Sequence, residues 1–237
     1  MALPRIDVPT YELVVPSTDE KIKYRPFLVK EEKLLLIAME SGKNEDILRG
    51  VKDIVDACTF NKLKLGDMPM FDVEYIFLQI RSKAVGEVST LRVLCKDDGE
   101  TYAKVEVDLT KIEVQVDDAH TNKIELSDVM GVIMKYPTID SFAENGIEDM
   151  TPSNMIDVVV TCISQIYNKK GEEVFDAKDS TKKELIEFVE QMNTKQFADV
   201  QKFFDTMPKL QHEITVLNPK TKKESKVVLS GLSDFFG

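Results

Sequence analysis

The sequence has no tryptophan, two histidines and three cysteines in 237 residues. Cys58, Cys95 and Cys162 are odd in number and far apart, which does not fit the disulfide framework of a small secreted protein, so we expect reduced thiols. The longest apolar run, Leu34 to Met39, is much shorter than the roughly 18 residues of a membrane span. Met1 to Arg5 lacks the apolar core of a signal peptide. These absences predict a chain that stays in a cytoplasm.

Recognisable catalytic motifs are also missing. No G-x-S-x-G, G-x-x-x-x-G-K-[ST], G-x-G-x-x-G or H-E-x-x-H sequence occurs, so hydrolase, phosphate-loop, dinucleotide and zincin interpretations lose their support. The acidic pairs Asp97-Asp98 and Asp117-Asp118 lack the spacing and distal glutamate of a calcium loop, which favours solvated turns. The sequence therefore predicts no cofactor, no metal ligand and no catalytic residue.

The net charge of the chain limits the classes of partner that we expect. Asp and Glu total 42 against 31 Lys and Arg, which gives a net charge of −11 and a pI near 4.8. Phosphate backbones and anionic lipid repel such a field, so we expect neither a nucleic acid nor a membrane as partner. The dense basic stretch Lys220 to Lys223 has the composition of a hairpin tip. Such a hairpin could still bind nucleic acid locally, and we keep this as a hypothesis that the net charge disfavours.

Residues 1–87 predict a β-hairpin followed by helices. β-prone residues at 11–15 and 22–25 flank a polar turn. Helices are expected at 30–40, before Ser41-Gly42, at 47–58, where apolar residues follow helical spacing, and from about 69 to 84. The aromatic series of the last helix, Phe71, Tyr75 and Phe77, is most simply helix core.

Residues 88–126 change to a β composition. Val88 to Leu94 and Tyr102 to Val107 flank an Asp-Gly turn, which is the strongest short-range signal for a hairpin. Two short alternating segments follow at 112–116 and 124–126. We predict an inserted β meander.

Residues 127–209 are predicted to return to helix. Ser127 is expected to cap a short helix that ends before Pro137, and Ser153 precedes a helix over 155–167. Thr181 and Glu184 form a capping-box pair, and Thr194 is expected to cap the helix that follows, which ends near Met207. A final hairpin over 212–217 and 225–229 leads into the tail.

These elements predict an α+β fold within the one or two domains that the length allows at about 150 residues each. A mainly helical, discontinuous body with an N-terminal hairpin is expected from 1–87 and 127–209, with the β meander inserted at 88–126. The C-terminal hairpin and the Phe235-Phe236 tail occupy 210–237. The Phe-Phe pair either docks on its own domain or is offered to a partner, and both interpretations stay open.

The sequence resembles the baseplate hub assembly family of T-even-like contractile-tailed phages, in the form carried by phages of marine cyanobacteria. The resemblance covers nearly the whole length. The segments that carry it are Leu3 to Leu13, Tyr24 to Lys33, Met70 to Tyr75, Arg81 to Glu87, Met134 to Thr138 and Gly231 to Phe236. Members of the family often have a zinc-ribbon-like C-x₂-C-G knuckle. Here Cys95-Lys96-Asp97-Asp98-Gly99 keeps one cysteine, so the resemblance implies a degenerate, metal-free hairpin.

The resemblance implies a non-enzymatic protein that binds other phage baseplate hub and tail proteins, with self-association as an additional expectation. It would act in the host cytoplasm during assembly, either as a virion subunit of the tail baseplate or as an assembly factor. The matching segments supply the candidate partner-binding residues Phe71, Asp72, Tyr75, Arg81, Gly86, Lys135, Tyr136, Pro137, Phe235 and Phe236. The alternative function is a small metal- or thiol-dependent enzyme centred on Cys95.

Overall fold

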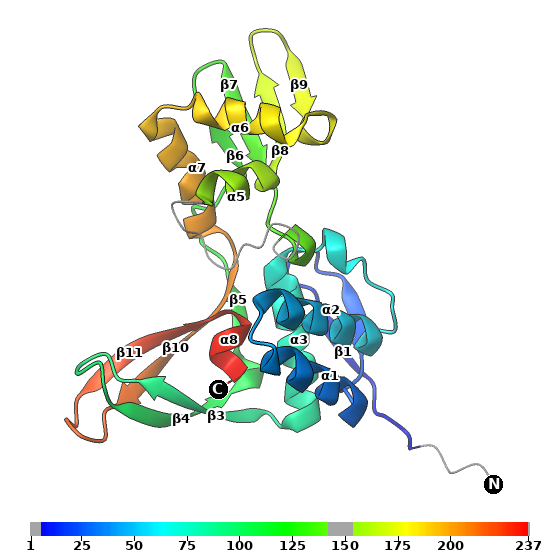
Figure 1. Ribbon diagram of the computed structural model, residues 1–237, viewed down its shortest axis with the longest axis vertical. Helices are drawn as coiled ribbons and strands as arrows, with labels where there is room; N and C mark the ends of the chain where they lie inside the picture. The colour runs from blue at the N-terminus through cyan, green and yellow to red at the C-terminus, as the bar shows by residue number, and fades with distance from the viewer. Residues whose placement is uncertain (1–5, 142–153, 237) are drawn as a thin grey trace. The chain divides into compact units, whose positions relative to one another are not determined.

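The computed structural model describes residues 6–141 and 154–236, with only the backbone of Ser233 and Phe236. The chain divides into two compact units: the first comprises Met1–Gln115 and Lys209–Gly237, and the second comprises Val116–Pro208. N-terminal helices and the C-terminal hairpin therefore belong to one unit, although they lie at opposite ends of the sequence (Figure 1). This division differs from the expected one, because antiparallel pairing of Lys209 with Gln115 places the inserted part at 116–208.

The helical part of the first unit agrees with the predictions. Strands β1 (Tyr11–Val14) and β2 (Lys21–Tyr24) form the N-terminal hairpin. Helices α1 (Val29–Glu40), α2 (Asn44–Cys58) and α3 (Met70–Val85) follow, with the short 3₁₀ helix η1 (Leu65–Asp67) before α3. Gly42 has a φ of +66° directly after α1, a conformation that costs glycine little, which is why the predicted helix ends there.

Two antiparallel β layers complete the first unit. Strands β3 (Val88–Leu94) and β4 (Tyr102–Asp108) form a two-stranded sheet, and η2 (Leu109–Lys111) follows them. The second layer has the strand order β11-β10-β5, from Glu224–Ser230, Lys209–Leu217 and Glu113–Gln115. The short helix α8 (Gly231–Phe236) ends the chain. One buried cluster joins these elements, with side chains that include Leu91, Val107, Val216, Leu229 and Phe235.

The predicted single meander over 88–126 is wrong. Strand β5 pairs with β10 of the C-terminal hairpin, and β6 (Lys123–Glu125) pairs with β7 in the second unit. Only the β3–β4 hairpin keeps its sequence neighbours as partners. The short strands carry no turn signal that fixes a local partner, so long-range pairing decides their sheets.

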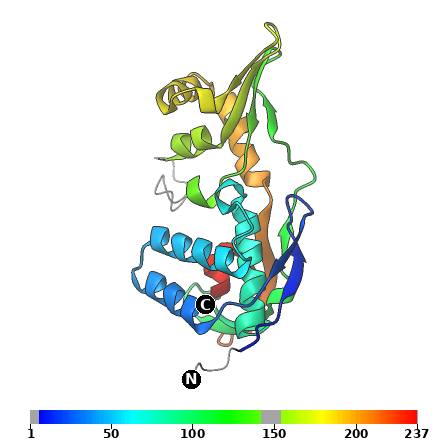
Figure 2. The same ribbon diagram turned by 90° about the vertical axis from the view of Figure 1, so that its right-hand side faces the viewer.

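The second unit is a four-stranded antiparallel sheet with helices packed on it. The strand order is β6-β7-β8-β9, and Figure 2 shows α5 and α6 on one side of this sheet. The further elements are β7 (Met130–Met134), α5 (Met155–Cys162), β8 (Ile163–Asn168), β9 (Glu173–Asp176), η3 (Ala177–Asp179), α6 (Lys182–Glu190) and α7 (Thr194–Thr206). Their shared core includes Val132, Val159, Leu185, Val200 and Phe203.

The helix predicted from Ser127 is wrong, because this segment forms β7 between two partner strands. The Ser127 hydroxyl caps a turn instead, accepting a hydrogen bond from Met130 N at 3.1 Å. Gly131 explains the close strand packing, because a Cβ at this position would lie 2.2 Å from the Tyr167 hydroxyl oxygen and 2.5 Å from the carbonyl oxygen of Ile124. A glycine at this position would weaken a helix, but in the sheet it allows Tyr167 and Ile124 to approach closely.

The helix predicted over 155–167 is correct only as far as Cys162. Residues 163–168 form β8, which pairs with β7 on one side and β9 on the other, so two ladders outweigh the helical spacing of its apolar residues. The proposed cap at Ser153 lies outside the described residues. The Thr181–Glu184 capping box is confirmed. For α7 the cap is Asn193, whose side chain accepts from Gln196 N at 3.0 Å, rather than Thr194.

Candidate protein-binding surfaces

The structure places several predicted site residues in the interior of the first unit. Phe71 is 6% exposed and Phe235 is 1% exposed. Tyr75 is half-buried against the same cluster as Phe235. Phe235 is thus docked within its own unit, while the side chain of Phe236 lies outside the described residues. These side chains stabilise the fold, and their contact with a partner stays a prediction.

Asp72 is also buried and has a structural partner. Its carboxylate accepts hydrogen bonds from the backbone N–H of Ser17 at 3.1 Å and from the Ser17 hydroxyl. Burial raises the pKa of Asp72, and the bonds from Ser17 oppose this shift. Asp72 therefore ties the first turn of α3 to the turn between β1 and β2.

The remaining predicted residues divide between the two units. Arg81 is half-buried, and desolvation lowers the pKa of its guanidinium, while Gly86 is exposed after α3 with a φ of +129°. In the second unit Lys135 is exposed, Tyr136 is half-buried and Pro137 is buried. The list predicted from the sequence therefore does not form one continuous surface within either unit.

Tyr136 takes part in an aromatic cluster that sequence analysis did not find. The His120 ring lies 5.6 Å from the Tyr136 ring and 5.2 Å from the Phe203 ring, measured between centroids. His120 Nε2 lies 3.0 Å from the Tyr136 hydroxyl, and Nδ1 lies 3.0 Å from Thr206 Oγ1. Because the Thr206 hydroxyl donates to the Lys202 carbonyl, Nδ1 donates to Thr206 and Nε2 accepts from Tyr136.

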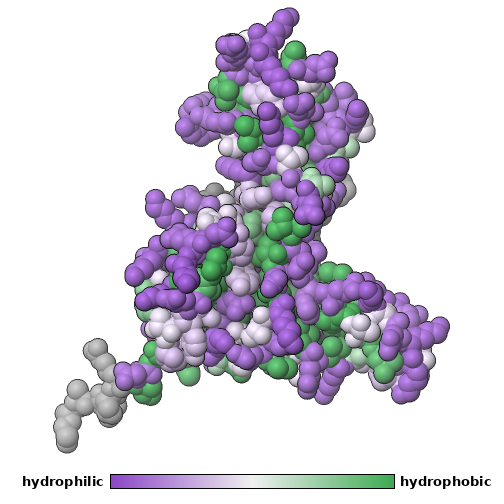
Figure 3. All heavy atoms as spheres, turned by 180° about the vertical axis from the view of Figure 1, so that it is seen from behind, coloured by the Kyte–Doolittle hydropathy of each residue, from purple (hydrophilic) through white to green (hydrophobic). Residues whose placement is uncertain are grey.

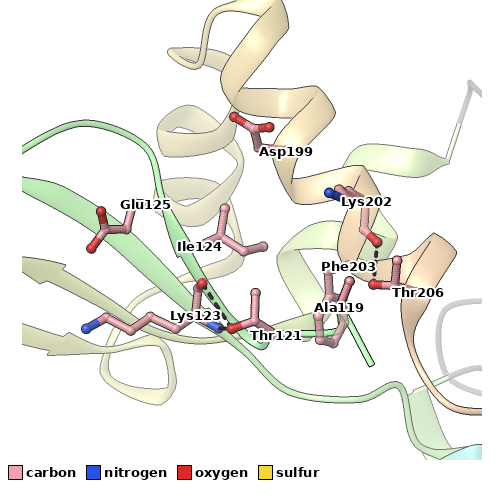
Figure 4. A pocket seen from close by; sticks show the side chains of 9 residues that line it. All are labelled: Ala119, Thr121, Lys123, Ile124, Glu125, Asp199, Lys202, Phe203 and Thr206. Atoms are coloured by element: carbon pink, nitrogen blue, oxygen red, sulfur yellow. Dashed lines mark hydrogen bonds between the residues drawn. The ribbon is translucent and has the colours of Figure 1, made fainter. Parts of the chain in front are cut away.

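This arrangement holds a neutral imidazole. Desolvation lowers the pKa of His120, and Asp117 only partly opposes the shift. A cavity of about 210 Å³ lies beside the cluster and is lined by both cations and anions, including Lys123, Glu125, Asp199 and Lys202 (Figure 4). This volume is below the range usual for small-molecule sites, and the lining charges favour no ligand of one sign. We interpret the cluster as structural.

In the first unit, side chains join the tip of the β3–β4 hairpin to the tip of the β10–β11 hairpin. Asn218 is fully buried, and its Nδ2 donates to Asp97 Oδ1 at 2.8 Å and to Asp98 Oδ2 at 3.0 Å. The Thr221 hydroxyl also donates to Asp97. Hydrogen bonds from Thr221 and Asn218 lower the pKa of Asp97, and bonds from Thr101 and Asn218 lower that of Asp98. The knuckle sequence is therefore held by amide and hydroxyl donors.

The cysteines have the properties of buried apolar residues. Cys58, Cys95 and Cys162 are free and at most 1% exposed. Desolvation raises the thiol pKa of Cys58 to about 11 and that of Cys162 to about 12, and it also raises the pKa of Cys95. Thiols in this state are weak nucleophiles, which argues against an enzyme centred on Cys95. Within residues 6–141 and 154–236, no group of three or more His, Cys, Asp or Glu is placed to hold a metal ion.

The most exposed apolar surface of the first unit lies on α1. Only Glu31 and Leu35 of this helix are buried. We call the solvent-facing apolar side chains the α1 surface, with exposed fractions of 80% for Val29, 54% for Leu34, 55% for Leu36, 53% for Ile37 and 40% for Met39. By contrast, the face drawn in Figure 3 is mainly hydrophilic, with hydrophobic residues in small groups. Contiguous exposed apolar side chains mark interaction sites in soluble proteins.

The α1 surface is fixed in place by its opposite side. Glu31 Oε2 accepts from Leu28 N at 2.6 Å, and Glu31 Oε1 lies 3.0 Å from the Arg25 guanidinium. Ala38 Cβ would lie 3.3 Å from a Cβ added to Gly50 of α2, so the two helices cross closely. The sequence contains a signal for this surface. A helix that packs on one side needs apolar residues on that side only, but the run Leu34 to Met39 places them around the whole helix.

These features define an α+β protein with a group of exposed apolar side chains on α1. Residues 8–237 match the family described as T4 bacteriophage base plate protein, and the chain belongs to this family. Membership indicates a structural component of the phage base plate, and hence of the virion, and agrees with a non-enzymatic role. No curated protein and no solved structure matches the chain. Among the described residues, no helix has the length and apolarity to cross a membrane.

Proposed function

We propose that this chain is a subunit of the base plate hub and that it works by protein–protein binding through the α1 surface. The observation that carries the proposal is the exposure of Val29, Leu34, Leu36, Ile37 and Met39 on one firmly anchored helix. Removing apolar surface from water contributes about 25 cal/mol per Å², so side chains of this size supply much of the stability of a protein interface.

Assignment to the hub, as a finer place within the base plate, is supported by the resemblance of six segments to hub assembly proteins. These segments come from both units of the chain. They include Tyr24 to Lys33, which enters α1 and contains both members of the Arg25–Glu31 ion pair. The same segment that carries the resemblance therefore positions the proposed binding surface.

Mass spectrometry of purified virions, together with capture of a tagged chain from infected cells, tests this function. We expect the chain in virions and hub proteins in the captured material. The double substitution Leu36→Ser and Ile37→Ser should reduce incorporation at least about tenfold without unfolding the chain, because both side chains are more than half exposed.

A matched control is available in the second unit. Val174 and Phe175 of β9 are 60% and 51% exposed, so Val174→Ser with Phe175→Ser removes a similar apolar area elsewhere. Equal incorporation of the α1 variant and this control would contradict the role of α1. Recovery of hub proteins with a chain that is absent from virions would instead identify an assembly factor and contradict the subunit assignment.

A further inference from the structure

Two charged residues interrupt the α1 surface and have opposite signs. Lys33 and Glu40 are both exposed and lie seven residues apart, so they are about 10.5 Å apart along the axis and nearly in line on one face. This separation prevents them from pairing with each other. Among the ion pairs of the described residues, neither takes part. Along the line that joins them, α1 thus offers one unused cation and one unused anion, while the exposed Glu32 lies about 100° around the helix from Lys33.

The positions of these charges are self-complementary under a two-fold rotation. An antiparallel copy of α1 that crosses at the midpoint between Leu36 and Ile37 places Lys33 of each copy opposite Glu40 of the other. Leu36 and Ile37 lie about 50° to either side of the line that joins Lys33 and Glu40, so the same rotation brings Leu36 against Leu36 and Ile37 against Ile37 of the other copy. A two-fold interface requires this kind of pairing, in which residue i meets residue j and j meets i.

We propose that the partner seated on the α1 surface is a second copy of this chain, bound antiparallel through α1 about a two-fold axis. The proposal rests on the proposed function only in taking α1 as a binding surface. Leu36 and Ile37 form the apolar contact, and two symmetric Lys33–Glu40 pairs set its orientation. Because Glu31 and the close crossing with Gly50 hold the helix, the surface needs no rearrangement to bind.

The contact is small, because a single helix of 12 residues from each copy forms it. Interfaces below the standard size of about 800 Å² per partner are usually transient. We therefore expect a dimer with a dissociation constant on the order of 10–100 µM, which assembly in a base plate would reinforce by bringing copies close together.

Analytical ultracentrifugation of the full chain with charge-reversal variants tests the proposal. Lys33→Glu alone and Glu40→Lys alone place like charges opposite each other twice, and each should weaken the dimer at least about tenfold. The double variant Lys33→Glu with Glu40→Lys restores both pairs in reversed order, and its dissociation constant should return to within about threefold of the original. Lys104→Glu on the exposed side of β4 is the matched control and should change nothing.

Two results would overturn the self-association. One is a chain that stays monomeric up to about 1 mM. The other is a dimer that the single reversals and the double variant affect equally. Capture of base plate proteins, measured in parallel, separates this proposal from the proposed function. A monomeric chain that still needs Leu36 and Ile37 to recover hub proteins keeps the function and loses the dimer. A dimeric chain that recovers no hub proteins supports the dimer and contradicts the proposed function.

Discussion

The first unit contains two apolar helical segments that have opposite environments. Phe235 in α8 is 1% exposed, whereas Leu36 and Ile37 in α1 are 55% and 53% exposed. From the sequence, docking of the terminal Phe-Phe pair on its own domain and its contact with a partner both stay open, and the structure shows Phe235 docked. Helix α1 contains the longest apolar run of the sequence, yet most of that run is exposed.

The difference follows from the number of neighbours that each segment has. Helix α8 packs on α3 and on strands β3, β10 and β11, whereas α1 packs mainly on α2. The turn of α8 is also held by hydrogen bonds, because Ser230 N donates to Asp234 Oδ2 at 2.8 Å and Leu232 N donates to the Glu74 carboxylate. Apolar content predicts burial only when the fold supplies enough partners.

The largest expected effect separates the two segments directly. Phe235→Ala should lower the free energy of unfolding by about 3–5 kcal/mol, because it leaves a cavity in the cluster shared by both hairpins. Leu36→Ala should change it by less than about 0.5 kcal/mol, since that side chain is more than half exposed. Denaturant unfolding followed by circular dichroism measures both. Similar losses would show that α1 is packed as tightly as α8.

A smaller loss is expected at the hydrogen bonds between the tips of the β3–β4 and β10–β11 hairpins. Asn218→Ala removes the buried amide that donates to Asp97 and Asp98, and it should destabilise the unit by about 1–3 kcal/mol. Lys220→Ala in the same turn is the control, because Lys220 contributes only its backbone N–H to the turn. An Asn218 variant as stable as the control would mean that the tips are held by their backbones alone.

The Glu74 carboxylate, which accepts a hydrogen bond from α8, gives an effect that disappears at low pH. Desolvation raises the pKa of Glu74 from 4.5 to about 7. The stability that the protonated side chain gives the folded state is therefore complete below pH 4.5 and is lost as the pH rises through 7. Glu74→Gln, which is neutral throughout, should therefore be more stable than the original by up to about 3 kcal/mol at pH 8 and equal to it below pH 4.5.

Thermal unfolding of this variant between pH 4 and pH 8 measures the difference. Glu106→Gln replaces an exposed carboxylate on β4 and should show no comparable trend. A stability difference that is constant across the range would exclude a buried, titrating Glu74.

Much of this fold is readable from local signals. The apolar spacing of α2, the capping box of Thr181 and Glu184, and the Asp-Gly turn of the β3–β4 hairpin each fix their own element. Strands β7 and β8 carry helix-like signals instead. Their identity depends on pairing between residues 130–134 and 163–168, which no local pattern encodes.

The binding surface is less readable, because the sequence does not show how many neighbours an element has. Leu34 to Met39 is visible as the longest apolar run, but its exposure follows from the packing of Glu31, Leu35 and Ala38 alone against the rest of the unit. The resemblance to hub proteins marked Phe71 and Phe235, which the structure shows in the core. The segments that carry the resemblance therefore include residues that stabilise the fold, and a match alone does not identify a binding residue.

Selective thiol labelling tests most directly whether α1 is an interface in the base plate. The three native cysteines are buried, so Ile37→Cys introduces an exposed thiol that a maleimide should modify readily in the dilute free chain. In isolated base plates, we predict that this thiol is protected at least about tenfold, while the thiol of Val174→Cys on β9 stays more reactive. Equal labelling of the Ile37→Cys variant in the free and assembled chain would contradict an interface at α1.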